Sequence, residues 1–260
     1  VHIHIKGFVE KEQFESQRLL GGIDISVPES SARGIDITFS RQYRGSNWTL
    51  SADAGGVWAN HETDSRYNPE HLSAGLNSTA CTFGNMGHWH YSLTGSVLGQ
   101  AGHTDSKSWS RYKWSSTLLC GWKHTGLSVS YAEGKTDGDA TWMDFYQMGG
   151  TIGTIQSEWL YSNRLQAPWF PAGALIGKQF SQLDLKIHLG REMPLIIYGS
   201  DISLWSEKPG RSERVAGCEW QIEVPICPIL RLAPMVLSTG VAYGLKGEIE
   251  SKWRGYVTTR

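Results

Sequence analysis

The chain has 260 residues, a formal net charge of -1, 40% hydrophobic and 19% charged residues, and 30 glycines, 12 tryptophans and 10 tyrosines. This balanced charge, without Lys- or Arg-rich blocks, argues against nucleic acid as a partner. Prolines and Arg231 interrupt the longest apolar stretch, residues 224–237, which excludes a transmembrane helix of about 18 apolar residues. Because the chain begins at Val1 without a leader, we expect a mature product or a fragment.

Apolar and polar residues alternate in stretches of roughly ten residues. In residues 34–43, for example, Ile35, Ile37 and Phe39 are separated by polar residues. Successive side chains of a strand point to opposite faces, so this pattern predicts strands with one apolar and one polar face. The predicted strands cover residues 2–8, 20–27, 34–43, 48–59, 72–83, 88–99, 112–122, 127–131, 182–189, 194–205, 216–226, 235–243 and 253–260.

The connections follow from the polar, Gly and Pro residues between these strands. Residues 10–18 form one helical turn or a loop, and residues 28–33 join the strands on either side into a hairpin. Residues 101–110 are the longest turn in the N-terminal half, and a long polar loop begins at Glu133. The acidic residues 137–144 only loosely resemble a calcium loop, and we expect them to be exposed.

Residues 146–171 break the alternating pattern. The segment contains Gly149, Gly150 and Gly153, followed by a cluster of aromatic residues and prolines between Trp159 and Pro171. We expect a long ordered loop here that folds over or into a single domain spanning residues 1–260.

The composition of the two faces favours a membrane barrel over a soluble sandwich. The polar face is rich in Ser, Thr, Gly, Asn and His, which suit a crowded, hydrated lumen, whereas the apolar face carries aromatic residues that suit membrane interfaces. Many predicted strands are nine to twelve residues long, as tilted membrane strands must be. The aromatic residues expected at strand ends are Trp48, Trp89, Tyr112, Trp122, Tyr131, Trp205 and Tyr243.

These features predict an all-β fold, an antiparallel up-and-down transmembrane β-barrel of about 12–14 strands in a lipid bilayer. The polar face of such a barrel lines its lumen. The residues predicted to face the lumen are Asp36, Asp53, His88, His90, Lys113, Asp184 and Lys186.

The C-terminal part resembles a known class of proteins. Residues 149–177, and the ending from residue 223 to Arg260, resemble outer-membrane β-barrel domains at the C-terminus of some bacterial surface proteins, including ones that follow a TolB-type β-propeller. The resemblance covers about the last 110 residues. It implies a Gram-negative outer membrane, insertion by the barrel-assembly machinery, and a barrel that anchors, exports or admits something.

No motif predicts a metal, a cofactor or a catalytic residue. The pairs His2/His4 and His88/His90 could each present two imidazoles on one strand face, but no third ligand is identifiable. The four cysteines lack metal-binding spacing and leave free thiols or disulfides open. Neither G-x-S-x-G nor H-E-x-x-H occurs, so we expect no enzyme, although a hydrolase built from distant lumen Ser, His and Asp residues stays open.

The predicted function is therefore a porin-like pore, an anchor or a component of an envelope complex in the bacterial outer membrane, with envelope proteins or a second copy as possible partners. The alternative is a soluble, secreted or surface all-β module. Such a module would bind carbohydrate or protein through exposed aromatic residues, namely Trp142, Trp169 and Phe170. Solubility without detergent distinguishes the two.

Overall fold

The structure is a computed structural model. It describes residues 2–12, 17–18, 24–25, 30–63, 68–141, 143–149, 159–160, 162–165, 167, 175–190, 195–205, 211–224, 235–247 and 252–259.

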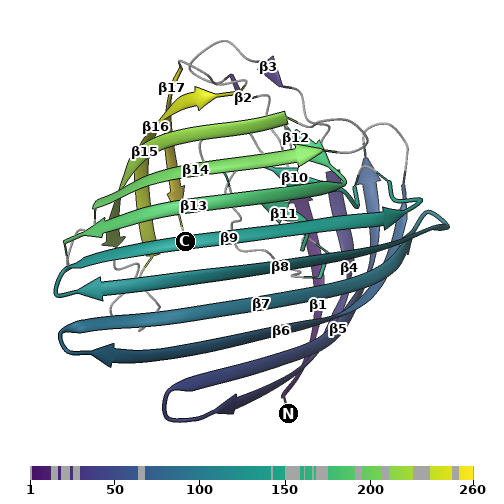
Figure 1. The fold of residues 1–260 in the computed structure, drawn as a ribbon. Helices are drawn as coiled ribbons and strands as arrows, with labels where there is room; N and C mark the ends of the chain where they lie inside the picture. The colour runs from purple at the N-terminus through teal and green to yellow at the C-terminus, as the bar shows by residue number, and fades with distance from the viewer. Residues whose placement is uncertain are drawn as a thin grey trace.

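Twelve long strands form one continuous antiparallel sheet that curves around a central space (Figure 1). The strands are β1 (His2–Glu12), β4 (Ser30–Arg44), β5 (Trp48–Thr63), β6 (Glu70–Met86), β7 (Trp89–Thr104), β8 (Lys107–Trp122), β9 (Thr125–Gly138), β13 (Gln179–Leu189), β14 (Leu195–Trp205), β15 (Arg211–Val224), β16 (Met235–Lys246) and β17 (Trp253–Thr259). Each pairs with the strands before and after it in this order, which confirms the predicted up-and-down barrel. β1 and β17 are the edge strands, and no pairing joins them among the described strands.

Two small sheets accompany the barrel wall. β2 (Gln17–Arg18) pairs with β3 (Asp24–Ile25). β10 (Tyr146–Met148) pairs with β11 (Arg164–Leu165) and β12 (Leu175–Gly177), and these three strands lie inside the curved sheet (Figure 1). We call the described residues of segment 139–178, which connects β9 to β13, the plug. It includes the described residues of the predicted loop 146–171, namely 146–149, 159–160, 162–165 and 167.

The two ends of the barrel differ in their connections. Three links at one end, residues 45–47, 87–88 and 123–124, are only two or three residues long, and we call it the short-turn end. β1 starts and β17 finishes at this end. The plug enters from the opposite, long-loop end, where β9 finishes and β13 begins. In outer-membrane barrels, short turns face the periplasm and long loops face the outside.

The outer face of the barrel is apolar. On β13, Leu183, Leu185 and Ile187 point outward and are 37–49% exposed, whereas Gln182 and Asp184 line a cavity inside. Similar outward rows of Leu, Ile, Val and Phe occur on β1, β4, β6 and β7. Contiguous apolar surface of this extent is rare on soluble monomers. It indicates that hydrocarbon, and not water, surrounds the wall.

Outward aromatic residues mark the two edges of this apolar band. Trp89 and Trp122 stack at the short-turn end with ring centroids 6.0 Å apart, and Tyr112 lies ten residues before Trp122 on β8. At a rise of about 3.3 Å per residue and a tilt of about 40°, ten residues span roughly 25 Å, the height of the apolar band in outer-membrane barrels. Trp48 lies at the short-turn end, and Trp205 and Tyr243 lie toward the long-loop end. Tyr131 departs from its predicted place at a strand end, since it lies midway along β9.

Three local predictions are wrong. Residues 20–27 and 34–43 do not form a hairpin, since β4 pairs with β1 and β5, and Asp24–Ile25 pairs with β2. The connection expected over 101–110 is a tight turn at Asp105 and Ser106, both with positive φ. The polar loop expected from Glu133 is the end of β9. Barrel strands continue past the apolar band, where both faces are polar and the alternation disappears.

No described helix is long and apolar enough to span a membrane.

The cysteines provide a test of which face each strand turns to lipid. Cys81, Cys120 and Cys218 are unpaired thiols, and Cys227 lies outside the described residues. Cys81 shares the inward face of β6 with Asn77 and Thr79, which line a cavity, whereas Cys120 and Cys218 share the outward face with Leu118 and Trp220. The C227S variant, reconstituted in liposomes, carries only these three thiols. We expect a lipid-soluble maleimide to label Cys120 and Cys218 first, and a charged maleimide to label Cys81 first. Mass spectrometry identifies the labelled peptides, and equal labelling of all three by the charged reagent would contradict the assignment.

Candidate functional site

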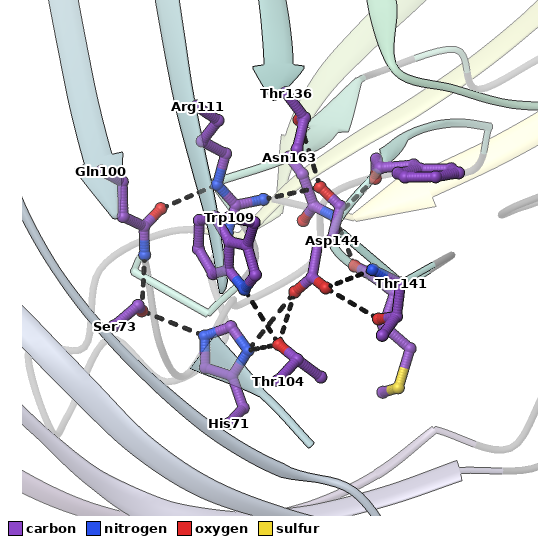
Figure 2. A network of polar contacts seen from close by, with 12 residues as sticks. His71, Ser73, Gln100, Thr104, Trp109, Arg111, Thr136, Thr141, Asp144 and Asn163 are labelled. Carbon is purple, nitrogen blue, oxygen red and sulfur yellow. Dashed lines mark hydrogen bonds and ion pairs between the residues drawn. The ribbon is translucent and has the colours of Figure 1, made fainter. Parts of the chain in front are cut away.

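A network of polar contacts joins the plug to the inner wall near the long-loop end (Figure 2). At its centre is Asp144, which is completely buried. Its Oδ2 accepts hydrogen bonds from the backbone N–H of Thr141 at 2.9 Å and from the hydroxyl of Thr141 at 2.7 Å, which fixes the local turn of the plug. Its Oδ1 accepts a hydrogen bond from the hydroxyl of Thr104 on β7 at 2.7 Å. Asp144 therefore binds its own segment and the wall at once.

The hydroxyl of Thr104 determines that Nδ1 of His71 carries a proton. Thr104 gives its one proton to Asp144, so it must accept at the 3.1 Å contact with Nδ1 of His71. Nδ1 of His71 therefore donates, and its Nε2 lies 3.0 Å from the hydroxyl of Ser73. Ser73 in turn accepts from Nε2 of Gln100 at 2.7 Å. A chain of hydrogen bonds thus runs from Gln100 through Ser73, His71 and Thr104 to the plug carboxylate.

The charge of Asp144 is retained inside the barrel. Burial raises the pKa of Asp144, but the nearby imidazole of His71 and the hydrogen bonds from Thr141 and Thr104 lower it by more, so the pKa lies below its ordinary value of 3.8. Arg111 on β8 supplies the nearby positive charge. Its guanidinium donates to the backbone carbonyl of Asp144 at 3.4 Å and to Oε1 of Gln100 at 2.9 Å.

The lowered pKa of Asp144 predicts that acid loosens the plug. A carboxyl group whose pKa is lowered by docking stabilises the docked plug above pH 3.8, and this contribution is lost as the pH falls through the lowered pKa. In planar bilayers, we expect the wild type to show more channel openings below pH 3.8 than at pH 7. Asp144→Asn should be open at both pH values and lose the acid response. Asp139→Asn, an exposed acid five residues earlier, should keep it; an identical response of all three proteins would contradict the assignment.

Trp159 is the second anchor of the plug. Its side chain is 4% exposed; the indole N–H donates to the hydroxyl of Thr38 at 2.8 Å, and its carbonyl accepts from Gln100 at 2.9 Å. The indole lies on the paired glycines Gly55 and Gly75. A Cβ atom on these glycines would come within 2.6 and 2.9 Å of the ring, so the wall leaves room for Trp159 only because both side chains are missing.

The other half of the lumen is filled by an apolar cluster. Tyr146 of the plug packs on Phe180 with ring centroids 4.5 Å apart, and its hydroxyl donates to the carbonyl of Tyr112 at 2.6 Å. Gly134 leaves room for this side chain, since a Cβ atom at position 134 would lie 2.5 Å from the Tyr146 hydroxyl. Met148, Leu165 and Ala167 of the plug and Ile196, Tyr198, Ile202 and Leu204 of β14 belong to the same buried cluster. The plug is therefore packed against both halves of the wall.

Ser73, His71 and Asp144 have the residue types of a hydrolase triad. Three features favour docking over catalysis at this place. Asp144 is 3.6 Å from His71, and Thr104 takes the hydrogen bond from Nδ1 that the acid of a triad accepts. Ser73 is 3% exposed, and neither of the two cavities described below reaches it. The arrangement explains how the plug is held without any reaction.

The lumen-facing candidates lie in different places. Asp53 and Lys113 line a cavity of about 210 Å³, and Lys113 and Asp184 line a second one of about 250 Å³. Asp36 is 8% exposed and accepts from Thr38, and Lys186 shares the inward face of β13 with Asp184.

The two remaining candidates are at the short-turn end. His88 lies in the exposed turn between β6 and β7, outside any strand, which corrects its predicted place on a lumen face. His90 is exposed at the start of β7 and contacts Asn85. The two imidazoles are therefore not held within the lumen. No three described His, Cys, Asp or Glu side chains are grouped closely enough to hold a metal ion.

The residues that hold the plug were missed. Asp144 falls in the polar stretch expected to be exposed, yet it is fully buried. Trp159 was noted only as part of an aromatic cluster, although aromatic residues in a segment that breaks the pattern are a usable signal for a lumen anchor. Trp142, Trp169 and Phe170, offered for the soluble alternative, lie outside the described residues.

Comparisons with known proteins support the fold. No protein-family model and no curated protein sequence matches the chain. The structure is similar to CdiB from Acinetobacter baumannii, with a TM-score of 0.58 and 11% identity over 99% of this chain and 46% of that one. Weaker matches are BamA from Haemophilus ducreyi lacking POTRA domains 1–3 (TM-score 0.42, 10% identity, 90% and 64% covered) and the translocator domain of autotransporter NalP from Neisseria meningitidis (0.30, 13%, 99% and 86%).

The chain thus spans about half the length of the CdiB chain. At this identity the similarity concerns the fold alone, and it supports the β-barrel part of the resemblance to outer-membrane domains. The association with a TolB-type β-propeller stays a prediction.

Proposed function

We propose that this chain is a β-barrel of the bacterial outer membrane whose lumen is closed by its own plug, and that it serves as an anchor or component of an envelope complex. The observation that carries the proposal is the docking of Asp144, Tyr146 and Trp159 on the inner wall. A free diffusion pore has no need of such contacts across its lumen. The porin-like role is therefore the weakest of the three predicted ones.

The outer face supports the membrane location. Its apolar rows lie between aromatic residues roughly 25 Å apart, and three of the short turns and both described chain ends lie at one end, as in barrels inserted from the periplasm. The fold similarity to CdiB agrees with this location. Envelope proteins that contact the wall or the short-turn end are the expected partners.

The two strands that flank the plug are paired with each other up to its two ends. Gln179 pairs with Lys135, and the carbonyl of Lys178 accepts from the backbone N–H of Thr136, so the ends of β9 and β13 are adjacent. Residues 140–177 can therefore be replaced by a short Gly-Ser linker. In planar bilayers we expect the wild type to insert without conducting and the linker variant to give stable steps of current. Equal current from both, with both barrels shown to be folded by their mobility on unboiled gels, would refute a closing role.

A further inference from the structure

We propose that the cavity on the short-turn side of Trp159 binds a short zwitterionic peptide of dipeptide size. The cavity has a volume of about 210 Å³. Pockets for drug-sized ligands measure about 300–1,000 Å³, so its occupant is smaller. The residues that line it are Thr38, Asp53, Asn77, Thr79, Ser96, Leu98, Lys113, Trp159 and Ser162.

Two opposite charges face this cavity without partners. Asp53 and Lys113 form neither a hydrogen bond nor an ion pair with any described side chain, and the amide of Asn77 is equally free. In the second cavity, Asp184 accepts from Ser200, and beside the plug Arg111 donates to Gln100. The guanidinium of Arg254 on β17 has no hydrogen-bond partner among the described residues, but it lines neither cavity. Charged groups left unpaired in a half-buried lumen favour a ligand of the opposite charge. Asp53 therefore suits an ammonium group, and Lys113 suits a carboxylate.

The register sets the distance between the two charges. Asp53 pairs with Asn77, Asn77 with Leu98, and Leu98 with Lys113, so the four residues form one row across four strands. Three steps of about 4.8 Å place the outer two roughly 14 Å apart along the curved wall. The Asp and Lys side chains shorten this gap on the lumen side. A single amino acid is too short to reach both, whereas the two ends of a dipeptide fit.

The groups between the charges suit a peptide bond. The amide of Asn77 and the hydroxyl of Thr79 can pair with a backbone N–H and C=O, and Leu98 offers apolar contact for a small side chain. Trp159 and Ser162 close the cavity from the plug side. The ligand would therefore enter from the short-turn end. The inference rests on the proposed function in that the docked plug forms one side of the site.

The test is a calorimetric titration of the whole chain in detergent with the dipeptide Ala-Ala, its N-acetyl form and its C-terminal amide. We expect Ala-Ala to bind about tenfold or more tightly than either blocked form, because each form loses one charge-assisted contact. The Asp53→Asn variant should bind Ala-Ala no more tightly than the N-acetyl form. The Lys113→Met variant should bind Ala-Ala no more tightly than the C-terminal amide. Asp137→Asn, which removes an exposed carboxylate on the outer rim, should leave both intact.

Two results overturn the inference. One is the absence of Ala-Ala binding to the wild type, and the other is equal binding of Ala-Ala and the two blocked peptides. The conductance of the same protein separates this failure from that of the proposed function. A non-conducting wild type that ignores Ala-Ala contradicts the ligand site and leaves the plugged barrel standing.

Discussion

Replacing Leu185 with Arg should lower the free energy of unfolding of the barrel in a bilayer by about 2–4 kcal/mol. Leu185 lies in the middle of β13, points outward and is 46% exposed. If hydrocarbon surrounds this position, the guanidinium loses its hydration there and has no protein partner. Leu93, outward on β7 and 44% exposed, should respond in the same direction. Denaturant titration of the protein in liposomes measures both.

The matched control lies on the opposite face of the same strand. Gln182 lines the inner cavity and its amide contacts Asp184, so Gln182→Arg places the new charge beside a carboxylate in a hydrated lumen. We expect a much smaller loss than for Leu185→Arg. Equal losses for the two variants, or none for either, would show that the outer face does not contact lipid.

Replacing Trp159 with Ala should release the plug. Truncating a buried Trp costs about 3–5 kcal/mol, and 1.4 kcal/mol corresponds to a factor of ten, so the undocked fraction should rise at least about a hundredfold. The loss combines the contact with Gly55 and Gly75 and the hydrogen bond to Thr38. Trypsin cleavage after Arg164, within the plug, reports the undocked fraction when opening is fast relative to cleavage.

Trp220→Ala is the control for this second prediction. Trp220 is an outward tryptophan on β15 that is 50% exposed and faces away from the lumen. Its removal should leave the rate of cleavage after Arg164 unchanged. A Trp159→Ala protein that is cleaved no faster than the wild type would show that the indole does not hold the plug in place.

The alternating pattern was sufficient to predict the wall. Leu185 and Asp184 are neighbours in the sequence, and a period of two residues places one in lipid and the other in the lumen without further information. The limits of the strands were harder to predict. Where β9 passes beyond the apolar band, Glu133, Lys135 and Asp137 face outward, and their polarity resembles that of a loop.

The plug was beyond prediction for a different physical reason. Trp159 and Thr38 are 121 positions apart, and nothing local to either one marks the contact. The indole of Trp159 packs on Gly55 and Gly75, which leave room for it because they have no side chain. Asp144 was predicted to be exposed because polar residues usually face water. In the structure, hydrogen bonds from Thr104 and Thr141 take the place of water around its carboxylate. His88 was misplaced because the turn at Gly87, with φ of +65°, removes it from the strand.

A comparison of boiled and unboiled protein on a gel, after carbonate extraction of the membrane fraction, tests the account most directly. A folded transmembrane barrel should stay in the membrane pellet, need detergent for extraction, and migrate differently before and after boiling. We predict this result for the wild type and for the linker variant that lacks residues 140–177. A chain that purifies from buffer without detergent and migrates identically before and after boiling would contradict the account.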